Sequence, residues 1–112
     1  MTTMDETRAL PDLSVEATGI ASFSADSLDE AALAALAMRA MGRHAAAVSE
    51  AGQARLVSVS HDVTGTRFAG GKGEVTSKID RQTRTLLFMG ADLVSEAGLH
   101  LHSTGIFRLD TD

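Results

Sequence analysis

Apolar positions follow two different periods along this chain. Residues 24–42, SADSLDEAALAALAMRAMG, are rich in alanine, leucine and methionine and contain no strand-forming run, which predicts a helix. From Ala54 onward, apolar residues recur at every second position, as they do in a strand with one buried face. The stretch LSVEATG, before the helix, predicts a short first strand. The expected order is a strand, one helix and then several strands.

Capping residues mark the ends of the predicted helix. Ser27 and Glu30 have the S-x-x-E spacing of a capping box, and Asp26 and Asp29 add negative charge at the positive end of the helix dipole. Gly42 is one candidate for the end of the helix. The next residues, RHAAAVSEAG, also have a helical pattern, so the alternative end is the second glycine, Gly52. The middle of the helix carries a single arginine among apolar residues, so we expect it to be buried on most sides.

The strands after the helix differ in the number of faces they bury. ARLVSVSHDVTGTRF alternates, and its predicted core face consists of Val57, Val59, His61 and Val63. TRTLLFMGADLV is apolar on both faces, which predicts a central strand covered on both sides. AGLHLHSTGIFRL alternates again after a SEAG hairpin. Its predicted apolar face consists of Leu99, Leu101, Phe107 and Leu109, and its polar face of His100, His102 and Arg108.

The glycine-rich segment RFAGGKGEV, residues 67–75, has two interpretations. A phosphate-binding loop needs the spacing GxxxxGK[ST] between a strand and a helix, and neither condition is met. The residues that follow alternate like a strand, with Val75, Ser77 and Ile79 on one face. We therefore predict a hairpin turn in which Gly70 and Gly71 adopt positive φ, and we expect no binding of nucleoside triphosphates.

Composition and charge narrow the classes of partner. The 112 residues make one small domain, with residues 1–12 predicted as a flexible tail and residues 13–112 as the folded part. A net charge of −5 without a basic run predicts that neither nucleic acid nor an anionic membrane is a partner. The chain has no cysteine, so it has no thiolate nucleophile and no cysteine zinc site. Its polar N-terminus lacks a signal-peptide core, which predicts a cytoplasmic protein.

The chain resembles the hotdog-fold superfamily of acyl-thioester enzymes. The resemblance rests on a buried helix followed by the run from VSVSHDV through FAGGKGEV to GLHLHSTGIFRL. The resemblance is to the small thioesterases of the phenylacetate-pathway and 4-hydroxybenzoyl-CoA types, and it covers residues 24–109. It implies an α+β fold, with an antiparallel sheet wrapped around one long central helix and FAGG at a turn between strands. It also implies a homodimer or homotetramer, because active sites of this family often combine residues of two subunits.

The resemblance places the active site at the helix entrance. Hotdog thioesterases commonly use a carboxylate to activate water or attack the carbonyl, and helix N–H groups to stabilise the oxyanion. The candidate catalytic residues are Glu16, Asp26, Asp29 and His61. The candidate residues for binding coenzyme A are Gly70, Gly71, Lys72, Lys78 and Arg84. The chain lacks the His-Gly-Gly helix entry of one family branch and the Asp with His-Val-Asn-Asn of the other.

Structural roles explain several of these residues equally well. Acids at a helix start stabilise the dipole, cations on a strand can simply be solvated, and His61 can be a hydrogen-bonded core histidine. His61 and Asp62 are adjacent on a strand and face opposite ways, so they make a poor dyad for hydrating an enoyl thioester. His100 and His102, two apart, could share a metal, but no third ligand is near, so no metal is expected. No G-x-S-x-G motif supports a serine triad.

Two functions from different classes remain. The first is an acyl-CoA thioesterase that cleaves a thioester of coenzyme A or of an acyl carrier, with no cofactor beyond the coenzyme A of the substrate. The second is a non-catalytic hotdog module that binds an acyl thioester or serves as a dimerisation domain, which agrees with the missing family motifs. Turnover of acyl-CoA substrates distinguishes them.

Overall fold

The structure, a computed structural model, describes residues 10–109 of the chain. The elements are β1 (Ser14–Ala17), β2 (Ile20–Leu28), α1 (Glu30–Val48), β3 (Ala54–Val63), β4 (Phe68–Gln82), β5 (Leu86–Ser95) and β6 (Gly98–Leu109). Most of the predicted tail, residues 1–12, lies outside the described residues, and the described Leu10 packs against the core. Within the described part of the chain, no helix is long and apolar enough to cross a membrane.

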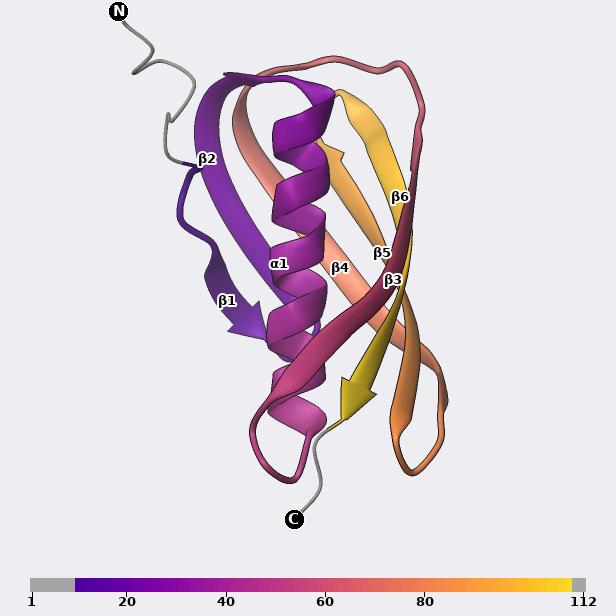
Figure 1. The fold of residues 1–112 in the computed structure, drawn as a ribbon. Coiled ribbons are helices and arrows are strands. Elements are labelled where there is room, and N and C mark those ends of the chain that lie inside the picture. Colours follow the sequence, from indigo (N-terminus) through magenta and orange to yellow (C-terminus); the bar gives the residue numbers. More distant parts are fainter. Residues whose placement is uncertain (1–9, 110–112) are drawn as a thin grey trace, which may run out of the picture.

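The six strands form one sheet in the order β1-β2-β4-β5-β6-β3, and all neighbouring strands are antiparallel. The sheet curls around α1, which lies along its concave face (Figure 1). The core fills the space between helix and sheet, and α1 contacts every strand except β1 closely. The predicted α+β fold, an antiparallel sheet wrapped around one helix, is therefore confirmed. β5 has the predicted central position, although its outer face is only partly covered within one chain.

α1 begins later than its predicted N-cap and ends between its two predicted ends. Asp29 is the N-cap, since its Oδ1 accepts a hydrogen bond from the N–H of Ala32 at 2.9 Å. The predicted capping box is wrong because Ser27 still belongs to β2, which pairs with β4 up to Leu28. The helix also continues through Gly42 to Val48, so the first candidate end is wrong, and the longer alternative is correct in extending the helix but places its end at Gly52 instead of Val48. The cost of a glycine inside a helix, about 1 kcal/mol, is small beside the packing of its apolar face.

The predicted hairpin between β3 and β4 does not exist. β3 pairs with β6 at one edge of the sheet, whereas β4 lies between β2 and β5, so residues 64–67 cross over from one side of the sheet to the other (Figure 1). Gly70 and Gly71 lie inside β4, opposite Asp26 and Ala25. Their φ angles are +123° and +106°, so the predicted positive φ is confirmed although the predicted turn is not. The SEAG hairpin between β5 and β6 is confirmed.

Two strands carry an irregularity that reverses part of the predicted alternation. In β3 the register shifts between Leu56 and Ser58, and Val57 is 57% exposed, contrary to the predicted core face. Val63 shares a face with His61 but is 54% exposed as the last residue of the strand. In β6 the register shifts near its start, so that His100 turns inward and is only 2% exposed while Leu99 is 39% exposed. A single extra residue on one strand changes which face the following side chains occupy. Beyond this point the predicted apolar face of β6 is correct.

Candidate functional site

The start of α1 presents unpaired amide groups. The side chain of Asp29 accepts from Ala32, and its carbonyl oxygen accepts from Leu33 at 3.1 Å. The N–H groups of Glu30 and Ala31 have no hydrogen-bond partner among the described residues. The first N–H groups of a helix point toward its positive dipole end, where they stabilise an anion. The helix entrance can therefore hold a carbonyl oxygen that gains negative charge.

The structure separates the predicted catalytic acids. Asp29 lies at the helix entrance, whereas Asp26 lies on the β2 face opposite the buried Phe23 and points away from the helix. Glu16 is in β1, where its Oε2 accepts a hydrogen bond from Ser22 Oγ at 2.5 Å. Ser22 precedes Asp26 by four residues of the same strand, which is about 13 Å. Only Asp29 of these three acids is therefore beside the free helix amides.

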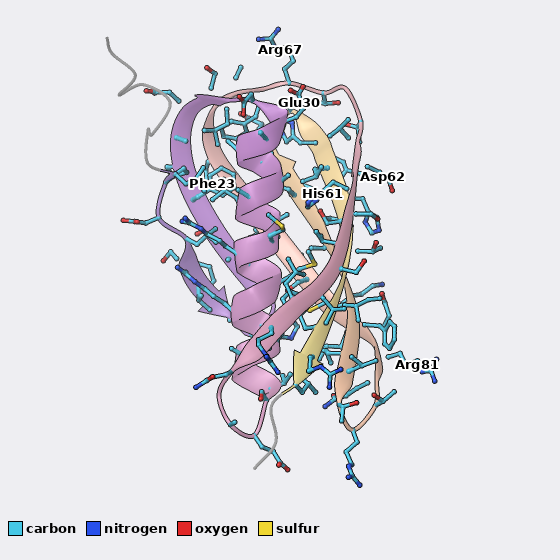
Figure 2. All side chains as sticks on the ribbon, in the orientation of Figure 1. Phe23, Glu30, His61, Asp62, Arg67 and Arg81 are labelled. Atoms are coloured by element: carbon cyan, nitrogen blue, oxygen red, sulfur yellow. The ribbon has the colours of Figure 1, made fainter. Side chains whose placement is uncertain are left out.

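His61 lies on the helix side of β3. Its Nδ1 is 2.7 Å from Oγ of Ser103, which is fully buried in β6. Figure 2 shows His61 beside the N-terminal half of α1 and Asp62 pointing to the other side of the strand. The expected opposite orientation of these two side chains is confirmed. Nε2 of His61 has no partner among the described residues, so the ring is oriented by Ser103 and keeps one nitrogen free.

The predicted coenzyme A residues fall into two groups. Gly70, Gly71 and Lys72 begin β4, paired with the end of β2 that leads into the helix entrance. Lys78 is six residues further along the same strand, about 20 Å from Lys72. Arg84 follows β4 and lines a cavity of about 450 Å³ beside the C-terminal end of α1. Gly70, Gly71 and Lys72 therefore lie opposite Asp26, Ala25 and Ser24, in the last part of β2 before the helix, whereas Lys78 and Arg84 lie further away.

The two neighbouring histidines of β6 cannot share a metal, because they face opposite sides of the sheet. His100 is buried, with its Nδ1 2.8 Å from the carbonyl oxygen of Thr66 and its Nε2 2.6 Å from Oγ of Ser95. His102 is on the outer face, where its Nδ1 is 2.6 Å from Oδ1 of Asp92. The predicted common direction is wrong because of the register shift at His100. No cluster of metal-ligating side chains occurs among residues 10–109.

A second polar pair was not predicted as a site. Nδ1 of His44, in the C-terminal half of α1, is 2.8 Å from Oγ of Ser77 on the inner face of β4. Burial lowers the pKa of His44 below its ordinary value of 6.5. A Cβ added to Gly19 would lie 2.7 Å from the carbonyl oxygen of Ser77 and 3.1 Å from Cε1 of His44, so the ring packs directly on the β1–β2 turn.

This pair lines a cavity of about 230 Å³ between the β1–β2 hairpin, α1 and β4. The polar residues Arg43, His44, Ser77 and Thr18 share the lining with small apolar side chains. The sequence held a signal for it, since His44 and Ser77 are polar residues on faces that are otherwise apolar. The cavity is separate from the helix entrance, because His44 is about 22 Å from Asp29 along the helix axis.

No protein-family model matches the sequence, and no curated protein matches it. Solved structures do match the fold. A thioesterase from Haemophilus influenzae superposes with a TM-score of 0.78 at 14% identity, over 89% of this chain and 78% of that chain. The PaaI protein of the phenylacetic acid degradation operon of E. coli gives a TM-score of 0.75 at 15% identity, over 89% and 79% of the two chains.

A variant of the phenylacetic acid degradation protein PaaI from Thermus thermophilus gives a TM-score of 0.72 at 19% identity, over 88% of this chain and 92% of that chain. Identities this low establish the fold and leave the activity open. All three matches span most of both chains, so the agreement extends to the whole sheet and the central helix. The chain therefore has the hotdog fold that these thioesterase-type structures share.

Proposed function

We propose that the chain hydrolyses acyl thioesters of coenzyme A or of an acyl carrier at the entrance of α1. The observation that carries this proposal is the pair of unpaired N–H groups of Glu30 and Ala31, at the N-terminus of the central helix of a hotdog fold. A thioester carbonyl oxygen placed there accepts both hydrogen bonds and gains stabilisation as its negative charge develops.

The reaction requires a base as well as an oxyanion site. Water attacks the carbonyl carbon while the base takes its proton, the intermediate collapses with cleavage of the carbon–sulfur bond, and the thiolate leaves and is protonated. Asp29 has one carboxylate oxygen that no capping bond uses, and His61 has a free Nε2 on the helix side of the sheet. We therefore propose these two residues as the acid–base groups and assign no catalytic role to Glu16 or Asp26.

We further propose that the active unit is a homodimer joined through β3, with a homotetramer as a larger assembly of such dimers. β3 is an edge of the sheet, and one side of it has no strand partner within the described chain. Leu56, Val57 and Val63 expose 45%, 57% and 54% of their surface along this strand. An exposed apolar edge strand favours pairing with another chain. A second copy placed there would also lie beside His61.

Paired substitutions test the acid–base assignment. Asp29→Asn keeps a good N-cap but removes the carboxylate, and His61→Asn keeps a group that can bond Ser103 but removes the titrating ring. We expect each to lower the rate of thiol release from acyl-CoA by about a hundredfold or more, with little change in melting temperature. Glu16→Gln, which can still accept from Ser22, is the control and should retain the parent rate. Parent rates in both test variants would refute the assignment, and saturable binding without hydrolysis would favour the non-catalytic module.

A further inference from the structure

The cavity around His44 has the size and lining of a ligand site. Its volume of about 230 Å³ exceeds that of an apolar cavity of about 150 Å³ that is large enough to hold benzene. Small side chains leave the space open, and four of them are alanines: Ala17, Ala21, Ala40 and Ala47. The β1–β2 hairpin forms one wall of the cavity, and a cavity larger than one that holds benzene can bury an apolar ring or branched chain among these alanines.

The charge of the lining favours an anion. Among the described residues, the cavity lining contains one arginine, Arg43, and no lysine, Asp or Glu. Nη1 of Arg43 donates a hydrogen bond to the carbonyl oxygen of Leu13 at 2.9 Å, which holds the guanidinium beside the hairpin. A guanidinium has five N–H donors, so further donors remain for a carboxylate.

The His44–Ser77 pair supplies a second polar contact inside the cavity. Because the ring is neutral, it has one donor and one acceptor nitrogen, and Ser77 engages Nδ1. Nε2 has no partner among the described residues, so it is free to donate when Ser77 donates to Nδ1. Contact with Gly19 fixes the ring in place, which reduces the entropy that a ligand must overcome.

The geometry points to a binding site for a small apolar carboxylic acid in its ionised form. Its carboxylate would contact Arg43 and His44, and its apolar body would lie among the alanines. The site lies at the opposite end of α1 from the proposed hydrolytic centre, and its existence does not depend on hydrolysis. A free acid and the carboxylate released from a thioester have the same chemistry here, so the probe is the acid itself.

Calorimetric titration of the full chain with benzoate at neutral pH tests this site, with benzamide as the uncharged probe of the same shape. We expect benzoate to bind saturably, with an affinity about tenfold or more above that of benzamide. The reason is that a hydrogen bond to a charged carboxylate is stronger than one to a neutral amide. Arg43→Gln should weaken benzoate binding by a similar factor. Ala47→Leu should abolish it by filling the cavity, whereas Ala97→Leu, at an exposed alanine outside the cavity lining, should leave it unchanged.

Nuclear magnetic resonance of the histidine rings gives a second readout of the location. Benzoate should shift the ring signals of His44 and leave those of His100, which is buried elsewhere, in place. Absence of saturable binding at millimolar benzoate, equal affinity for benzamide, or undiminished binding in a folded Ala47→Leu variant would each overturn the proposal.

Discussion

Individual residues show how burial changes their chemistry. Desolvation lowers the pKa of His44, so the ring is uncharged at neutral pH and bonds Ser77 as a neutral partner. In the unfolded chain the same ring is hydrated and has its ordinary pKa. Folding is therefore linked to pH through this residue.

His44 predicts a pH dependence of stability. The pKa of His44 in the folded state lies below 6.5, so the unfolded state binds the proton more readily than the folded state. The contribution of His44 to the free energy of unfolding is therefore complete above pH 6.5, and it is lost as the pH falls through the folded pKa. His44→Asn can still bond Ser77 and does not titrate. We expect the free energy of unfolding, measured with denaturant, to fall more in the parent than in the variant between about pH 7.5 and about pH 5.5. This range lies above most carboxyl pKa values, so the carboxylates contribute little to the difference. Equal slopes in the parent and the variant would contradict the expectation.

Residue-level signals in the sequence were informative but incomplete. Alanine, leucine and methionine correctly predicted α1, because helix propensity acts locally. The choice between Ser27 and Asp29 as N-cap depends on how far β2 pairs with β4, and no local pattern contains that pairing. His44 and Ser77 stood on apolar faces in the sequence, but only the fold shows that they meet across helix and sheet.

Among the elements, the edge strand β3 differs most clearly from its prediction, and it leaves apolar side chains exposed. Its alternation was recognised from the sequence, yet one extra residue at Val57 moved a predicted core residue to the surface. Register shifts of this kind depend on the partner strand and therefore escape single-sequence analysis. The result is an edge whose apolar side chains have no cover within the described chain.

Val57→Lys tests whether this edge is the subunit interface. A lysine on an edge strand opposes pairing with another chain, because it must be desolvated at the interface. We expect sedimentation velocity at micromolar concentration to show a dimer for the parent and a monomer for Val57→Lys. Val15→Lys, at a residue of the other edge strand with a similar exposure of 56%, is the matched control and should remain dimeric. A monomeric parent, or dissociation only in the Val15 variant, would contradict an interface at β3.

For the whole molecule, the sequence predicted the architecture but not the path of the chain. One helix that is apolar on most sides must bury its surface, so the strands that accompany it form a sheet that curls around the helix. The crossover between β3 and β4 was missed because adjacent strands in sequence usually pair, and here β4 pairs with β2 instead. This path pairs Gly70, Gly71 and Lys72 with the part of β2 that precedes the helix.

The path also gives the molecule two separate polar centres along one helix. Asp29 and the free amides lie at one end, and the His44 cavity lies about 22 Å away toward the other end. Hydrolysis and acid binding are therefore separable by substitution, and neither result decides the other.

Cleavage of thioesters at the helix entrance can be tested in a single assay. Purified protein is incubated at neutral pH with short-chain, aromatic and long-chain acyl-CoA, and free thiol is measured against the spontaneous rate. We expect enzyme-dependent release of thiol, saturable in substrate, from at least one of the three classes of acyl-CoA. Saturable binding of acyl-CoA with no thiol release above the spontaneous rate in any class would contradict it.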